Sequence, residues 1–124
     1  MILDPAALDT TAIYKLLIGA VVPRPIAWVS SQSRDGILNL APYSFFTVAS
    51  RQPPMLAISI GPRTGGEPYP KDTLSNIRET KEFVINSVSM HLANAMFETS
   101  QNYPPEVDEF ARAGVTPAPC EVVK

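Results

Sequence analysis

Residues 23–46, PRPIAWVSSQSRDGILNLAPYSFF, decide the fold because they contain two short apolar segments separated by a polar turn. Ile26 to Ser31 alternates its side chains with the period of two that is typical of a strand. Gln32 to Gly36 predicts a turn, since an Asp-Gly pair readily adopts the positive φ that tight hairpins require. Ile37 to Ala41 is then the return strand, and we expect Pro42 to stop it. The stretch therefore predicts an antiparallel hairpin.

This hairpin carries more hydrogen-bonding side chains than the building of a core requires. They are Ser30, Ser31, Asn39, Tyr43 and Ser44. The serines are ambiguous, because serine is common in turns. Asn39 is more informative, because an asparagine within an apolar strand must find buried partners. We hypothesise that the hairpin holds a ligand and that the rest of the chain supports it.

Composition limits the class of protein. The 124 residues predict a single domain with a modest core. With 10 Lys and Arg against 12 Asp and Glu, the net charge is -2 and the pI about 5.3, which argues against nucleic acid as a partner. The single cysteine, Cys120, fits a reducing compartment. No stretch predicts a signal peptide or a membrane span, so we expect a cytoplasmic protein without a membrane partner.

Two further strands are expected, at Met55 to Ile60 and at Phe83 to Val88. Bulky side chains between the hairpin and the third strand should fill the core; these are Phe45, Phe46 and Val48. Residues 61–70 contain three Gly and three Pro and predict a long irregular loop, a type of segment that is often functional. Four antiparallel strands with connecting helices give an α+β fold, and four strands are too few to close a barrel well.

Helices are expected at four places. The first can be capped by Asp9, Thr10 or Thr11, presents Ile13, Leu16 and Leu17 as its apolar face, and ends near Gly19. The second runs from Lys71 to Thr80 with Leu74 and Ile77 on its inner face. A third is capped by Ser89, and the fourth spans Asp108 to Ala113 with Gly114 as its stop.

No catalytic residue is predicted. The lone histidine, His91, lies in the first turn of a predicted helix, where an exposed surface histidine is the expected role, and no nucleophile motif accompanies it. One histidine and one cysteine far apart in sequence make no zinc site. Gly65-Gly66 lacks the Lys and Ser or Thr of a phosphate loop, and no dinucleotide-binding glycine motif is present.

The start of the helix at Lys71 is a candidate anion site. A helix N-terminus offers free backbone N–H groups and a partial positive charge, to which the Lys71 cation and the Thr73 hydroxyl are added. The alternative is an ordinary capped helix, in which Asp72 or Thr73 is the cap and Lys71 is solvated. Trp28 is likewise open between a core residue and a platform for a cofactor. Together these residues favour a phosphate-bearing aromatic ligand.

Motifs in order along almost the whole chain make it similar to the flavin reductase-like family of FMN-binding split barrels. They are residues 23–31, Gly36, residues 39–46, Pro53-Pro54-Met55, Ser59, residues 71–77, residues 82–86, Ala95-Met96, Asp108-Glu109-Phe110 and residues 113–117. The resemblance implies an antiparallel Greek-key split β-barrel with short peripheral helices, in which residues 1–124 form the flavin-binding domain. Family members continue past the point that matches Cys120 to Lys124, so we expect a barrel truncated at its C-terminus.

The resemblance also implies the ligand and the residues that bind it. FMN is the expected cofactor, with FAD as an alternative, bound near the interface of a homodimer. The residues expected to line the flavin ring, ribityl chain and phosphate are Trp28, Val29, Ser30, Ser31, Asn39, Leu40, Ala41, Pro42, Ser44, Ser59, Lys71, Asp72 and Thr73. Lys71 to Thr73 would contribute to phosphate binding, which is where the helix terminus independently predicts an anion.

The implied chemistry is hydride transfer from NADH or NADPH to flavin N5, with reduced flavin passing to a partner monooxygenase or staying bound. The protein would orient and tune the flavin, so the lack of an acid–base residue is expected. Two alternatives stay open. One is an FMN-binding electron carrier of the flavoredoxin type without direct NAD(P)H oxidation, and the other is a truncated, non-catalytic domain.

Overall fold

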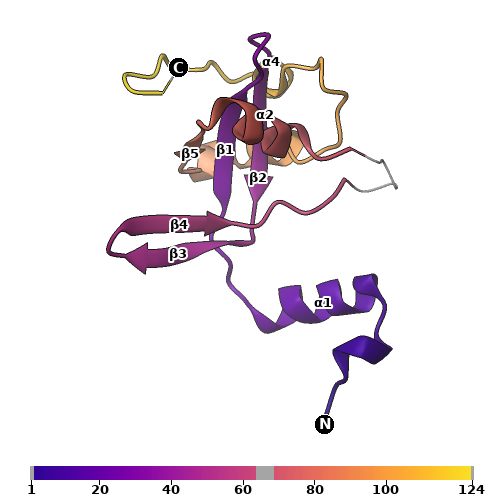
Figure 1. Cartoon of the computed structure of the whole chain (residues 1–124). Coiled ribbons are helices and arrows are strands. Elements are labelled where there is room, and N and C mark those ends of the chain that lie inside the picture. Colours follow the sequence, from indigo (N-terminus) through magenta and orange to yellow (C-terminus); the bar gives the residue numbers. More distant parts are fainter. Residues whose placement is uncertain (1, 64–68, 124) are drawn as a thin grey trace.

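The computed structural model describes residues 2–63 and 69–123. Its strands form two antiparallel sheets (Figure 1). In the first, β1 (Ala27–Gln32) lies between β2 (Leu38–Tyr43) and β5 (Val84–Asn86); in the second, β3 (Phe46–Arg51) pairs with β4 (Pro54–Ile58). The helices are η1 (Pro5–Ala7), α1 (Thr10–Ala20), α2 (Asp72–Thr80), η2 (Met90–Leu92), α3 (Ala93–Glu98) and α4 (Glu109–Ala113). The fold is α+β, as predicted, and the described strands close no barrel among themselves.

The predicted hairpin is confirmed as β1 and β2. Its register places Ser31 opposite Asn39 and Val29 opposite Ala41. The turn depends on Gly36, whose φ is +86°. Residues that carry a side chain rarely adopt this backbone conformation. The Gln32 side chain closes the turn by donating to the Gly36 carbonyl at 3.1 Å.

The prediction that Pro42 stops the return strand is wrong, because β2 continues to Tyr43. Two features accommodate the proline. First, β2 is an edge strand of its sheet, where an absent N–H is tolerated. Second, Pro42 lies opposite Trp28, whose carbonyl accepts from Asn86 on the β5 side, so this pair requires no N–H from Pro42.

Phe45, Phe46 and Val48 were expected to fill the core between two strands, and instead Phe46–Arg51 forms a fifth strand, β3. Val48 is 71% exposed, so its predicted core role is wrong. The physical reason is the position of the β3–β4 ribbon, which projects from the β2–β1–β5 sheet (Figure 1). A two-stranded ribbon that stands apart leaves most of its side chains in contact with solvent.

The hydrophobic core is small and lies on the β1–β2 pair. Ala27 and Val29 are fully buried, and Tyr43 is 6% exposed. The half-buried residues packed against this cluster are Ala41, Phe46, Ile58, Ile60 and Ile85. The core therefore joins the first sheet to the base of the ribbon.

The helix predictions are confirmed in their positions and corrected in two details. Asp9 caps α1 by accepting from the Ala12 N–H at 2.7 Å, and Gly114 ends α4 with a φ of +67°. Ser89 precedes η2 but makes no side-chain cap bond, so its predicted capping role is wrong.

His91 is exposed, as expected. No helix in the two described ranges is long and apolar enough to cross a membrane.

The inner face of α2 differs from the prediction. Its buried residues are the polar Thr73 and Asn76, whereas the expected Leu74 and Ile77 are half-buried. Apolar periodicity misled here because α2 packs on β1 and β2 through hydrogen bonds as well as apolar contact. This polar face leads to the candidate site.

Candidate functional site

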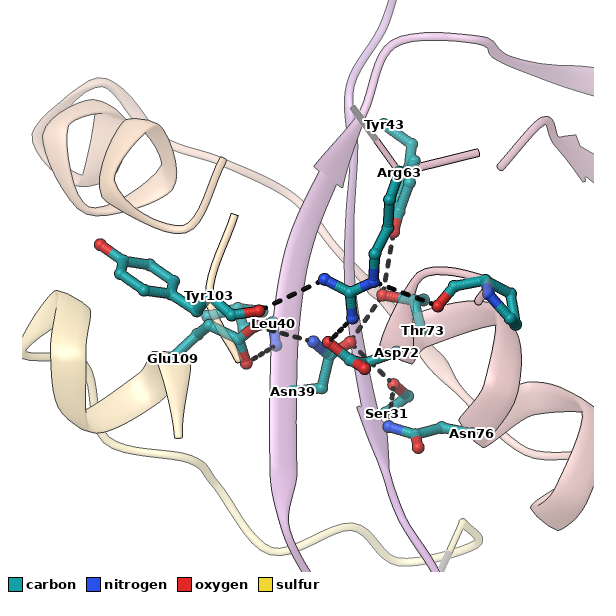
Figure 2. A network of polar contacts seen from close by, with 11 residues as sticks. Ser31, Asn39, Leu40, Tyr43, Arg63, Asp72, Thr73, Asn76, Tyr103 and Glu109 are labelled. Carbon is teal, nitrogen blue, oxygen red and sulfur yellow. Dashed lines mark hydrogen bonds and ion pairs between the residues drawn. The ribbon is translucent and has the colours of Figure 1, made fainter. Parts of the chain in front are cut away.

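Buried polar side chains from four elements meet where α2 and α4 pack on the β1–β2 hairpin (Figure 2). We call this set the polar junction: Ser31 from β1, Asn39 and Tyr43 from β2, Thr73 and Asn76 from α2, and Glu109 from α4. Each of these residues is at most 7% exposed. A buried polar group must be hydrogen-bonded to be tolerated, so the partners of each side chain define what the junction can do.

Asn39 is the centre of the junction. Its Oδ1 atom accepts from the Thr73 hydroxyl at 2.6 Å and from the Ser31 hydroxyl at 3.1 Å. Its Nδ2 atom donates to Glu109 Oε1 at 2.9 Å. The requirement that a buried asparagine find partners is thus met by side chains from β1, α2 and α4, as Figure 2 shows.

Two further hydrogen bonds extend the junction on either side of Asn39. The Tyr43 hydroxyl donates to Thr73 Oγ1 at 2.9 Å. Asn76 Nδ2 donates to Ser31 Oγ at 3.2 Å. Both ends of the β1–β2 contact with α2 are therefore fixed by side-chain bonds, and the first turn of α2 is held at the level of Tyr43.

Glu109 is the single carboxyl of the polar junction. Burial raises its pKa to about 7, and the charge of Asp72 adds to this rise. Two hydrogen bonds lower the pKa in part: the bond that Oε2 accepts from the Leu40 N–H at 3.2 Å and the bond from Asn39. Burial also raises the pKa of Tyr43, so its phenol stays protonated and can donate.

Cations and an acid surround the start of α2. Arg63 forms a 2.5 Å ion pair with Asp72 and donates to the carbonyls of Pro70 at 3.2 Å and Tyr103 at 3.3 Å (Figure 2). Lys71 Nζ lies 5.6 Å from the centroid of the Tyr43 ring. Burial, followed by the charge of Arg63, lowers the pKa of Lys71. The cationic groups of Arg63 and Lys71 therefore lie near backbone donors at one helix terminus.

A cavity of about 40 Å³ opens at this helix terminus. The residues that line it include Asn39, Ala41, Pro42, Tyr43, Arg63, Lys71, Asp72, Thr73 and Glu109, together with residues 99–103. Binding pockets for whole organic ligands usually measure ~300–1,000 Å³, so this space suits a small group such as a phosphate and not a ring system.

The predicted site residues separate into groups in the structure. Those that line the small cavity are Asn39, Ala41, Pro42, Lys71, Asp72 and Thr73. Ser30 and Ser31 line a different cavity of about 410 Å³, which also contacts Cys120. Trp28, Val29 and Leu40 are buried in the β1–β2 pair, and Trp28 Nε1 donates to Thr99 Oγ1 at 2.9 Å.

Ser44 and Ser59 lie outside both groups. The Ser44 hydroxyl accepts from Arg24 Nε at 3.3 Å, and Arg24 also donates to the carbonyls of Ile18 and Val21 at the end of α1. Ser59 follows β4 and is exposed; its N–H donates to the Phe45 carbonyl at 2.8 Å. The structure thus brings the α2 residues together with those of β2, and it leaves these two serines apart from them.

Sequence reasoning missed four residues of this region: Arg63, Asn76, Tyr103 and Glu109. Arg63 lies in the loop that was expected to be functional, so the loop composition was a usable signal. Glu109 immediately follows the helix cap Asp108, and a carboxylate at that position is usually explained by the helix dipole alone. Only the packing of α4 against β2 reveals its bonds to Asn39 and Leu40.

The family model described as "Flavin reductase like domain" matches residues 18–123. The chain belongs to the flavin reductase-like family. An uncharacterized protein of Aquifex aeolicus is 50% identical over 116 residues, which are 94% of this chain and 58% of that protein. The predicted resemblance to this family is therefore confirmed.

Two solved structures extend the comparison. Nitrilotriacetate monooxygenase component B from Bacillus cereus is 36% identical with a TM-score of 0.89, covering 99% of this chain and 59% of that one. Pseudomonas fluorescens 2-nitrobenzoate 2-nitroreductase is 31% identical with a TM-score of 0.85, covering 99% and 57%. This flavin reductase-like chain has the split-barrel type of fold, and it spans somewhat less than three fifths of the length of these relatives.

Proposed function

We propose that this flavin reductase-like chain binds FMN and contributes the flavin site of an NAD(P)H-dependent flavin reductase. The observation that carries the proposal is the start of α2, where Lys71, Arg63 and the backbone N–H groups of the first helical turn adjoin a phosphate-sized cavity. Membership of the family supports a flavin as the ligand, and the helix terminus supports a flavin with a phosphate. FAD would also carry a phosphate there, so the cavity alone favours neither of the two.

The residues present suit the phosphate end of FMN. Lys71 precedes the first turn of α2 and lines the small cavity, and its ammonium group lies 5.6 Å from the centroid of the Tyr43 ring. Asp72 occupies the same turn, and its ion pair with Arg63 reduces the repulsion that a phosphate would otherwise meet. The cavity is too small for the flavin ring, so the ring would lie beyond it, toward the Ala41 and Pro42 side of the lining.

Bound FMN would supply the hydride acceptor, which is a chemistry that no side chain of the polar junction can perform. The role of the chain is then to hold and orient the cofactor. The buried hydrogen bonds of Asn39, Thr73 and Tyr43 serve this role by fixing the first turn of α2 against β2.

Two partners belong to the proposal. A second copy of the chain, forming a homodimer, is supported by the exposed apolar side chains of α1 and the β3–β4 ribbon. A monooxygenase that uses the reduced flavin is supported by the similarity to a protein named as a monooxygenase component. Each is a separate extension, and neither is needed for flavin binding.

The direct test is a visible absorption spectrum of the purified chain with added FMN, recorded anaerobically before and after NADH and then NADPH. We expect FMN to bind and the flavin absorbance to bleach. A chain that neither binds FMN nor bleaches it contradicts the proposal. Flavin binding without bleaching would favour an electron carrier. The matched control is a full-length relative, because this chain spans only part of its relatives' length.

A further inference from the structure

In the polar junction, the number of protons on each group decides which group donates and which accepts in every hydrogen bond. The Thr73 hydroxyl has one proton, and it donates this proton to Asn39 Oδ1 at 2.6 Å. Thr73 Oγ1 can therefore only accept from Tyr43, which it does at 2.9 Å. The Ser31 hydroxyl likewise donates to Asn39 Oδ1 at 3.1 Å and accepts from Asn76. Both branches thus converge on the same oxygen.

The orientation of the Asn39 amide determines this direction. An amide turned by 180° would place an NH₂ group against the Thr73 and Ser31 hydroxyls and an oxygen against the carboxylate. Above pH 7, where Glu109 is mainly ionised, it prevents this, because an ionised carboxylate only accepts hydrogen bonds. Its Oε1 atom takes one from Asn39 at 2.9 Å, and its Oε2 atom takes one from the Leu40 N–H at 3.2 Å. Glu109 is the final acceptor of the whole set.

This direction has a consequence at the start of α2. Because the Thr73 hydroxyl gives its proton to Asn39 and accepts from Tyr43, it has no donor left for an anion in the adjoining cavity. The backbone N–H of Thr73 lies in the first turn of α2, where amides have no partner within the helix. Thr73 can therefore serve a phosphate through its main chain while its side chain anchors the turn.

We propose that Glu109 is a positioning residue for the phosphate end of the flavin site, acting through Asn39 and the Thr73 hydroxyl to fix the first turn of α2. The assignment of the anion as the flavin phosphate rests on the proposed function, whereas the positioning of the turn does not. Glu109 lines the small cavity, but its two oxygens already accept from Asn39 Nδ2 and the Leu40 N–H, so the role assigned to it is exerted through these bonds and not through contact with the anion.

A charge swap between two positions tests this role. Glu109→Gln alone places an NH₂ group against either Asn39 Nδ2 or the Leu40 N–H, both of which are donors. Asn39→Asp alone places two carboxyl groups against each other. In the double variant, the new amide at position 109 can donate to the new carboxylate at position 39 and still accept from Leu40, while Thr73 and Ser31 keep their acceptor. Glu106→Gln, at an exposed carboxylate three positions away, is the matched control.

The first measurement needs no flavin. Amide hydrogen exchange is followed by NMR at about pH 8, where Glu109 is mainly ionised, at Leu74 and Ser75, whose N–H groups both donate to the Lys71 carbonyl in the first turn of α2. We expect each single variant to exchange there about tenfold faster than the unaltered chain, the double variant to recover, and Glu106→Gln to have no effect. Unchanged exchange in the single variants, or no recovery in the double variant, overturns the proposal. If a single variant fails to fold, recovery of the fold in the double variant decides the same question.

The second measurement compares the dissociation constants of FMN and riboflavin at about pH 8, where Glu109 is mainly ionised. We expect Glu109→Gln to weaken FMN about tenfold and riboflavin less than about twofold, with recovery in the double variant. Equal weakening of both flavins contradicts a role at the phosphate end. If the unaltered chain binds neither flavin, the proposed function fails, and the exchange measurement still decides whether Glu109 positions α2.

Discussion

The polar junction and the region formed by α1 and the β3–β4 ribbon contrast in what they leave exposed. In the junction, Asn39, Thr73 and Glu109 are at most 6% exposed, and no buried side-chain nitrogen or oxygen in the described ranges lacks a partner. In the second region, large apolar side chains are about half exposed or more: Leu17 at 49%, Val48 at 71% and Leu56 at 53%. Figure 1 shows α1 and the ribbon set apart from the β2–β1–β5 sheet.

The difference indicates where the chain is self-sufficient. Polar atoms that are buried without partners cost free energy, and the junction contains none among the described residues, so its side chains require no hydrogen-bond partner from further protein. Covering exposed apolar side chains with further protein surface lowers the free energy. We therefore expect substitutions in the junction to change folding and the site, and substitutions of the exposed side chains of the ribbon to have little effect on the isolated chain.

The largest expected effect comes from the same substitution made in both regions. Leu40 in β2 is 1% exposed, and Leu40→Ala should lower the free energy of unfolding by about 2–5 kcal/mol through lost burial and a cavity. Leu56→Ala in β4 should lower it by less than about 0.5 kcal/mol. Urea denaturation followed by circular dichroism measures both. Similar losses would show that the ribbon is part of the cooperative core and would remove the contrast.

Removing the central amide of the junction should have the next largest effect. Asn39→Ala deletes the partner of Ser31, Thr73 and Glu109 at once, and we expect a loss of about 2–4 kcal/mol because these groups remain buried. Asn94→Ala, at an exposed position of α3, is the control and should change stability by less than about 0.5 kcal/mol. The measurement is again the urea midpoint, and a loss below 1 kcal/mol for Asn39→Ala would mean that water replaces the amide.

The junction also shows how far the sequence alone reaches. The β1–β2 hairpin was predictable because alternation and an Asp-Gly turn act over short distances. The first helix was predictable from its capping residues, and the last from Gly114 as its stop. Asn39 was correctly singled out, since a polar residue in an apolar strand requires a partner. Its partners were not predictable, because Thr73 and Glu109 are distant along the chain and meet Asn39 only through tertiary packing.

The errors share a cause. Val48 was expected in the core, and Leu74 and Ile77 on the inner face of α2, since side-chain hydrophobicity was taken to indicate burial. Hydrophobicity predicts the burial that a chain can gain, but the arrangement of the elements decides which side chains obtain it. The β3–β4 ribbon lies beside the sheet instead of on it, and α2 presents Thr73 and Asn76 to β1 and β2 because Ser31 and Asn39 offer hydrogen bonds there.

The pH dependence of stability should distinguish the two regions as well. The pKa of Glu109 rises from an ordinary 4.5 to about 7 on folding, chiefly by burial, so the folded chain binds more protons than the unfolded chain between these values. This stabilisation is complete below 4.5 and is lost as the pH rises through 7, by up to roughly 3 kcal/mol.

Glu109→Gln should flatten the curve of unfolding free energy against pH over that window, measured by urea titrations in steps between pH 4.5 and 7. Glu106→Gln is the control and should leave the slope unchanged. Asp72, whose charge also faces Glu109, is held in its ion pair with Arg63 and is present in all the variants. An unaltered slope in Glu109→Gln would show that Glu109 is more hydrated than its burial indicates.

The smallest expected effect is on ligand binding, and it is tested by comparing one lysine of the α2 site with one lysine of the exposed region. Lys71 lies at the start of α2 beside the Tyr43 ring, and Lys15 lies exposed on α1. Lys71→Ala should weaken FMN by about 1.5–3 kcal/mol, because a charge-assisted contact to the phosphate is lost, and should leave riboflavin nearly unchanged. Lys15→Ala should change neither. Fluorescence titration of the two flavins gives both constants. If Lys71→Ala weakens the binding of FMN and of riboflavin equally, the lysine supports the fold of the junction through Tyr43 and does not bind the phosphate. If Lys15→Ala weakens the binding of FMN, the cofactor is bound by the exposed region and not at α2.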